Sequence, residues 1–208
     1  MIKKLQALKA KKGFTLVELV VVIAIIGVLA AILIPTMIGV VQDANITSAD
    51  STASQIKTQA TTFLTKADST FKEPLKGEQA VTGAIASFTV STTGGATTWA
   101  VDGTAVGQFG GGSKVTWSGG SDKEKDFCTF MADVLRDFKN GKVEIAIKGC
   151  SIIGVAVVPG TTGTVPGTAV SNWDAGTFNF GSDTTTKAGV TSGGEIVGTN
   201  PKLQLPTT

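Results

Sequence analysis

Histidine and tyrosine are absent from the 208 residues of this chain, and cysteine occurs only twice. Without histidine the chain has no Ser-His-Asp or Cys-His catalysis and no histidine-containing zinc site, and two cysteines are too few for a four-thiolate zinc site. Paired carboxylates remain as a catalytic arrangement, but nothing in their spacing indicates one. We therefore expect neither an enzyme nor a bound metal or other cofactor.

Charge is distributed unevenly along the chain. Residues 1–12 contain five lysines and no acid, and residues 19–41 contain no charged side chain. Without the first segment, 13 basic side chains stand against 16 acidic ones. The formal net charge of +2 therefore does not indicate a basic surface, and we expect no nucleic-acid partner.

The uncharged stretch from Leu19 to Val41 is long enough to cross a membrane, since a helix of about 20 apolar residues spans the hydrocarbon layer. The lysines before it predict a cytoplasmic N-terminus, with everything after Val41 outside. A secretory signal peptide has a shorter apolar region, about 7 to 15 residues, followed by a cleavage site of small residues. We expect a single-pass membrane helix with its N-terminus inside.

The junction before this stretch reads Lys-Lys-Gly-Phe-Thr-Leu-Val-Glu, from Lys11 to Glu18. It resembles the class III signal of type IV pilins and pseudopilins, which has a short basic leader, a glycine, a phenylalanine, and a glutamate five residues after the glycine. The resemblance covers residues 1–71 well, and beyond them only the layout is similar. It implies that a prepilin peptidase cuts after Gly13 and methylates the new amine of Phe14.

The position of Glu18 has a physical rationale. An ionisable group beside a membrane span is costly and usually has a partner. Cleavage would place a positive amine on Phe14, one turn and about 6 Å away along a helix. Glu18 could pair with its own amine or with that of a neighbour, and the resemblance implies that the second pairing sets the register of an incoming subunit. A solvated interfacial acid is the alternative interpretation.

Gly27 and Pro35 bracket the weakest part of the expected helix, because proline removes a backbone donor and glycine costs about 1 kcal/mol relative to alanine. Pro35 lies at the position where the family's helix bends. The resemblance implies that this segment can lose helical structure in an assembled pilus. A simple kink is the alternative.

The helical pattern continues beyond the apolar stretch, because no glycine or proline occurs in residues 42–72. Apolar residues recur there at steps of three and four and leave a narrow stripe on a polar helix. One helix from Phe14 to about Thr70 would be roughly 85 Å long. We expect its second half to pack on a sheet, although a coiled-coil seam would have a similar stripe.

The sequence after residue 72 predicts short strands and one more helix. Ser121 and Glu124 form an expected capping box for a helix over residues 122–139, which Asn140-Gly141 would end. Residues 152–158 are nearly all apolar and should form a central strand. The expected strands are 87–90, 97–101, 114–117, 142–148, 151–158, 177–180, 195–197 and 203–205. The predicted fold class is α+β, with a long N-terminal helix packed on an antiparallel sheet, in agreement with the resemblance to pilins.

Cys128 and Cys150 are candidates for a disulfide, since an even pair in an oxidising exterior favours a bridge. Two buried free thiols are the alternative. Many pilins place their disulfide around a loop near the C-terminus, and this chain does not.

These features predict a leader over residues 1–13, a membrane and fibre-core helix over 14–41, and an extracellular head over 42–208. The resemblance implies a structural subunit, a major type IV pilin, that leaves the cytoplasmic membrane to form a helical surface filament of identical copies. Its partners would be a prepilin peptidase and a pilus assembly platform. The alternatives are a pseudopilin of a secretion or DNA-uptake system and a membrane-anchored binding module. Adhesion and motility are further roles that such filaments have.

Overall fold

The computed structural model describes residues 14–76, 83–102, 108–109, 114–160, 189–190 and 195–201. The chain divides into two compact units, residues 1–43 and 44–208. The elements in chain order are α2 (Leu16–Ser69), β1 (Leu75–Lys76), β2 (Ala84–Thr93), β3 (Ala96–Asp102), β4 (Gln108–Phe109), α4 (Phe127–Val134), β5 (Gly141–Lys148), β6 (Ser151–Pro159) and β7 (Gly198–Asn200). The predicted α+β fold is confirmed.

The long helix α2 has nearly the limits that the sequence predicts. Within the second unit its buried side chains recur at steps of three or four residues, as one face of a helix requires. They are Ala49, Ala53, Ile56, Ala60, Phe63, Leu64 and Ala67. On the exposed surface, threonine hydroxyls donate to carbonyls four residues earlier, as Thr58 does to Ser54 and Thr61 to Lys57. The predicted apolar stripe on a polar helix is therefore present.

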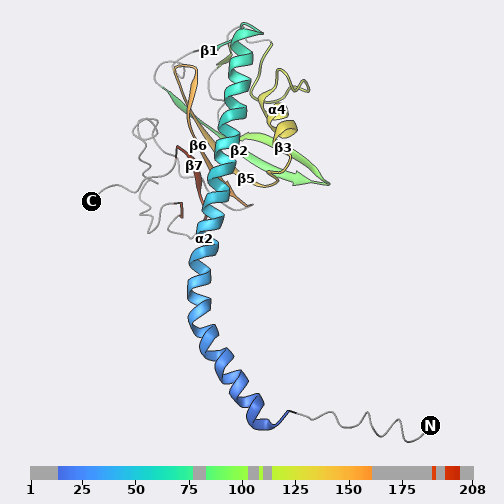
Figure 1. Cartoon of the computed structure of the whole chain (residues 1–208). Helices are drawn as coiled ribbons and strands as arrows, with labels where there is room; N and C mark the ends of the chain where they lie inside the picture. Colours follow the sequence, from blue (N-terminus) through green and yellow to red (C-terminus); the bar gives the residue numbers. More distant parts are fainter. Residues whose placement is uncertain are drawn as a thin grey trace, which may run out of the picture. The chain divides into compact units, whose positions relative to one another are not determined.

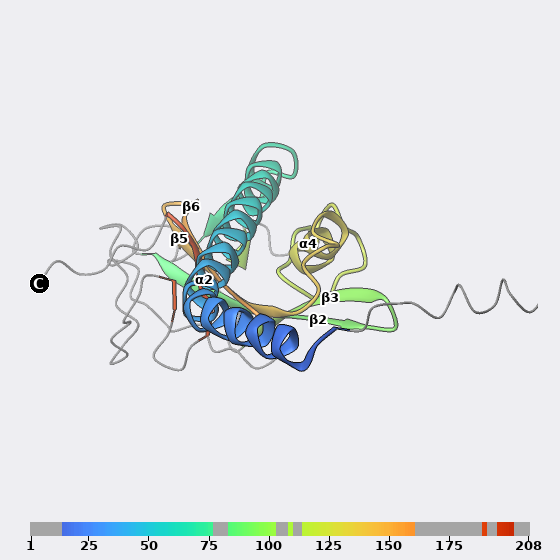
Figure 2. The same cartoon turned by 60° about the horizontal axis from the view of Figure 1, so that its bottom comes forward.

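Five strands form one antiparallel sheet in the order β3-β2-β5-β6-β7, and β1 pairs with β4 separately. The hairpin between β2 and β3 turns at Gly94 and Gly95, whose φ angles are 61° and 84°. Positive φ at both central residues favours glycine in such a turn. In the second unit, α2 crosses one face of the sheet, and α4 lies beside it near β2 and β3 (Figures 1 and 2).

The middle strand is β5, so the prediction of a central strand at residues 152–158 is wrong in this detail. β6 is an inner strand: it pairs with β5 along its length but with β7 over only three residues, from Val155 to Val157. β6 is apolar because its second half is buried on both faces of the sheet. Val155 and Val157 lie in the main core, and Ala156 and Val158 lie in a second cluster.

The main core lies between the sheet and the two helices. The ring of Phe127, at the start of α4, packs against those of Phe63 on α2, Phe88 on β2 and Trp117, with centroid distances of 5.3, 5.2 and 5.0 Å. All four side chains are buried. Aromatic pairs at such separations contribute beyond the area that they bury. This aromatic cluster holds both helices to one face of the sheet.

The opposite face of the sheet carries a smaller apolar cluster and one buried acid. The cluster consists of Ala146, Ala156, Val158 and Val197. Glu144 lies on β5 opposite Ala156 and is 6% exposed. The Ser87 hydroxyl lies 3.4 Å from Oε1, whereas Oε2 has no hydrogen-bond partner among the described residues. Burial raises the pKa of Glu144 to about 7, and the bond from Ser87 offsets only part of this.

The predicted helix over residues 122–139 is too long, and its predicted cap is wrong. The helix α4 has only eight residues, and Asp126 is its N-cap, with the carboxylate accepting from the Thr129 amide at 2.8 Å. The same carboxylate also accepts from the Gly120 amide at 2.8 Å and the Thr116 hydroxyl at 3.0 Å. These bonds hold residues 114–126 in a folded loop, so the helix begins only at Phe127.

Most predicted strands lie in observed ones, with two exceptions among the described residues. Residues 114–117 form only an isolated bridge, from Thr116 to Asp126, because this segment closes the loop before α4. In place of a strand over 195–197, Ile196 forms an isolated bridge with Val190, and the strand β7 follows. The predicted strands 177–180 and 203–205 lie outside the described residues.

Candidate functional site: the exposed apolar helix segment

The helix α2 starts with a reciprocal cap. The Glu18 carboxylate accepts from both the backbone amide and the hydroxyl of Thr15, each at 2.8 Å, and the Thr15 hydroxyl lies 3.2 Å from the Glu18 amide. This is a capping box, which satisfies amides that have no partner inside the first turn. A carboxylate is also favoured at the positive end of the helix dipole. Phe14, just before the cap, is 88% exposed, and Gly13 lies outside the described residues.

Beyond the cap, the first unit exposes almost nothing but apolar side chains. The large hydrophobic residues from Phe14 to Val41 are 48% to 88% exposed. The best 18-residue window of α2 has a mean hydropathy of 3.1 and no buried residue. Each such side chain gains about 1.5 to 3 kcal/mol when it leaves water, so this segment requires lipid or other protein around it. It is the part of the described chain that is long and apolar enough to cross a membrane.

The helix continues through Pro35. The Thr36 hydroxyl donates to the Leu33 carbonyl at 2.9 Å, one turn earlier. A shallow hollow of about 400 Å³ follows, between Leu33 and Gln42 on one side of the helix. A side chain at Gly27 would meet no atom within 4 Å. In this form of the chain, the segment that the sequence marks as weak is an intact helix.

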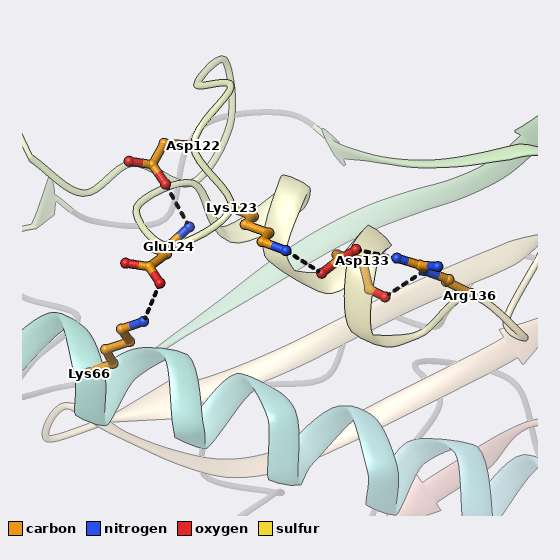
Figure 3. A network of polar contacts seen from close by, with 6 residues as sticks. All are labelled: Lys66, Asp122, Lys123, Glu124, Asp133 and Arg136. Carbon is orange, nitrogen blue, oxygen red and sulfur yellow. Dashed lines mark hydrogen bonds and ion pairs between the residues drawn. The ribbon is translucent and has the colours of Figure 1, made fainter.

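The head carries a network of charged side chains that joins the loop before α4 to its neighbours (Figure 3). The Lys66 ammonium on α2 lies 3.3 Å from the Glu124 carboxylate. Asp133 pairs with Arg136 at 2.6 Å and with Lys123 at 3.2 Å, and these bonds lower the pKa of its carboxyl group. All of these groups are substantially exposed to solvent, so each pair contributes little to stability. The network orients the loop and has no feature of a catalytic site.

The predicted disulfide is wrong, because Cys128 and Cys150 are both free. Cys128 is buried at the start of α4, where burial, reinforced by the charge of Asp126, raises the pKa of its thiol to about 12. Cys150 is exposed in the turn between β5 and β6, and its Sγ donates to the Leu75 carbonyl at 3.1 Å. The two thiols therefore contact different parts of the head.

Two important residues were not recognised from the sequence. Thr15 forms the cap with Glu18, although the pattern Thr-x-x-Glu before an apolar run is a readable signal for it. Asp126 organises the loop before α4, and no local pattern indicates this, since two of its partners precede it by six and ten residues. Among the described residues, no three Asp, Glu, Cys or His side chains are grouped so as to hold a metal ion.

Comparison with protein families accounts for most of the chain. A family model described as a domain of unknown function, DUF5021, matches residues 46–204. The chain belongs to the DUF5021 family. A second model, the prokaryotic N-terminal methylation motif, matches residues 8–34 of this DUF5021 chain. The methylation motif thus covers the end of the predicted leader, the cap at Thr15 and Glu18, and most of the exposed apolar segment.

Curated relatives resemble about a quarter of the DUF5021 chain. A fimbrial protein of Pseudomonas aeruginosa is 51% identical over 53 residues, 26% of this chain and 34% of that protein. A fimbrial protein of Moraxella nonliquefaciens is 46% identical over 55 residues, 26% of this chain and 36% of that protein. The type IV narrow pilus major component PilA5 of Thermus thermophilus is 46% identical over 46 residues, 22% of this chain and 40% of that protein.

The chain thus spans little more than a third of the length of these relatives. No solved structure matches it. The DUF5021 chain carries an N-methylation motif and is similar over about a quarter of its length to fimbrial and type IV pilus proteins, so the resemblance found in the sequence is confirmed.

Proposed function

We propose that this protein is a major structural subunit of a type IV pilus, cleaved after Gly13, methylated on Phe14 and polymerised through residues 14–41. The observation that carries the proposal is the apolar helix segment from Phe14 to Val41, which the methylation motif matches as far as Ile34 and whose large side chains are all exposed. Lipid covers such a surface before assembly. Lateral packing of identical segments covers it in a filament, where burial of apolar area drives association.

The proposed partners follow from this assembly. A prepilin peptidase removes residues 1–13, an assembly platform extracts the chain from the cytoplasmic membrane, and copies of the chain form the fibre. The subunit is a single-pass protein with its N-terminus inside before extraction and lies in a surface filament afterwards. We assign it no catalytic role, which is supported by the absence of histidine from the sequence.

Mass spectrometry of filaments sheared from cells tests the proposal. A major pilin should dominate the sheared material and begin at N-methylated Phe14. If the processed chain is found only in membranes and not in sheared filaments, the protein is a pseudopilin and not a major pilin. A retained Met1 would refute processing and assembly together.

Two variants separate the charge of Glu18 from its capping role. In Glu18→Gln the amide oxygen still accepts bonds from Thr15 but carries no charge, whereas Thr15→Ala removes the hydroxyl and leaves the charge. If Glu18 pairs with the amine of a neighbouring Phe14, Glu18→Gln should insert normally and lose most filaments, while Thr15→Ala should retain them. Equal filament yields in the two variants would contradict the pairing.

A further inference from the structure

The first turns of α2 in the second unit are held more weakly by apolar packing than the later turns. From Ile56 onward the helix buries large side chains, including Phe63 and Leu64. Before Ile56 it buries only Ala49 and Ala53. Alanine removes little apolar area from water, so burial contributes little to holding this part of the helix.

Hollows flank the same turns. A space of about 380 Å³ lies between the α2 residues Asn45 and Thr52 and the side chains of Phe138 and Pro159. A second, of about 240 Å³, extends to Gln55. Both hollows are clefts that open to the surface, so the helix is less closely packed on these sides than in the core.

Two glycines near the end of the chain approach the same turns closely. A Cβ atom at Gly198 would lie 2.0 Å from the backbone carbonyl carbon of Ala49, and one at Gly189 would lie 2.6 Å from Cγ2 of Ile46. No side chain fits at such distances. The short strand β7 and the residue at 189 therefore lie directly against α2.

Two charged side chains of α2 reinforce this contact. Asp50 Oδ1 accepts from the Thr199 amide at 2.8 Å. Lys57 Nζ donates to the Ile153 carbonyl at 3.1 Å and to Asn200 Oδ1 at 3.3 Å. Asp50 and Lys57 are two turns apart, about 10 Å along the helix, so their bonds bracket the contact. Partial burial lowers the pKa of the Lys57 ammonium, as expected for a cation drawn out of water by this contact.

We propose that Gly189 and residues 198–200 form a clasp that sets how much of α2 is bound to the sheet. With the clasp closed, the second unit begins at Ala44. With the clasp open, the helix is held only from Ile56 onward, where its large side chains enter the aromatic core. The free helix then gains the 12 residues from 44 to 55, about 18 Å at 1.5 Å per residue. The clasp thus sets how many residues of α2 are free of the sheet, whatever the apolar segment binds.

Hydrogen exchange of the full-length chain in detergent micelles, followed by mass spectrometry, tests the clasp. A helix segment released from the sheet loses the tertiary packing that stabilises it, so its amides exchange faster while the rest of the chain stays protected. In Asp50→Ala and in Lys57→Met, amides of residues 44–55 should exchange at least about tenfold faster, while those of 60–69 and β5 stay unchanged. Asp68→Ala is the matched control, because Asp68 is an exposed acid on the same helix.

Faster exchange confined to residues 44–55 in both variants supports the clasp. The clasp is refuted if residues 44–55 keep their protection in both variants, or if 44–55 and 60–69 lose protection together. Gly198→Ala forces a side chain into the Ala49 backbone and should open the same segment most strongly. Because that variant also strains β7, the decision rests on Asp50→Ala and Lys57→Met.

Discussion

Replacing Glu144 by glutamine should remove most of the pH dependence of the head's stability between pH 4.5 and 7. The pKa of Glu144 is about 7 in the folded chain, against an ordinary value of 4.5. Between these values the folded state holds a proton that the unfolded state has lost, so the free energy of unfolding falls as pH rises. The contribution is fully present below pH 4.5 and lost above pH 7.

The size of this effect follows from the shift of about 2.5 pKa units, at 1.36 kcal/mol per unit, which gives about 3 kcal/mol. The window is unusually clean because the chain has no histidine, the side chain that ordinarily titrates there. Bonds from the Glu124 amide and from Lys125 lower the pKa of Asp122, and bonds from Arg136 and Lys123 lower the pKa of Asp133. Both carboxyl groups therefore titrate below this range.

The assay is urea unfolding of the full-length chain in micelles, followed by tryptophan fluorescence from pH 4.5 to 8. The wild type should lose about 3 kcal/mol across this range, and Glu144→Gln should stay nearly flat and be the more stable protein at pH 8. Glu124→Gln is the control, because Glu124 is exposed and should leave the wild-type slope in place. A flat wild-type profile, or an unchanged slope in Glu144→Gln, would refute the assignment.

Three further predictions concern the head. Iodoacetamide at pH 8 should label Cys150 in the folded chain and Cys128 only after unfolding, because burial holds the Cys128 thiol protonated; labelling of both in the folded chain would contradict this. Phe63→Ala should cost about 3 to 5 kcal/mol in urea unfolding, since it empties the centre of the aromatic core. Asp126→Ala should cost on the order of 3 kcal/mol, because three donors lose their acceptor; a loss below 1 kcal/mol would show that the loop folds without it.

The parts of the fold that could be predicted are those determined by residues close together in the sequence. The limits of α2 follow from the absence of glycine and proline from residues 42–72 and from the apolar stripe that ends near Ala67. The Gly94-Gly95 turn fixes the β2–β3 hairpin in the same local way. The exposed segment, which is the candidate site, was likewise evident from charge and hydropathy.

The parts that could not be predicted depend on distant partners. The start of α4 is set by Asp126, whose carboxylate binds Thr116 and Gly120 across a folded loop. β7 is positioned by α2, through Asp50, about 150 residues earlier in the chain. The cysteine pair failed as a prediction because sequence spacing does not show where two side chains point, and Cys150 points to Leu75.

The capping box at the start of α2 has a consequence for maturation. Both of its residues, Thr15 and Glu18, lie after the proposed cut at Gly13, and Phe14 is the only residue between the cut and the cap. Proteolysis there would leave both residues of the cap in place, so the capped first turn of the helix need not refold when the leader is lost. Maturation is then conformationally silent: it changes the charge and chemistry of one amine and leaves the backbone beyond it as it was.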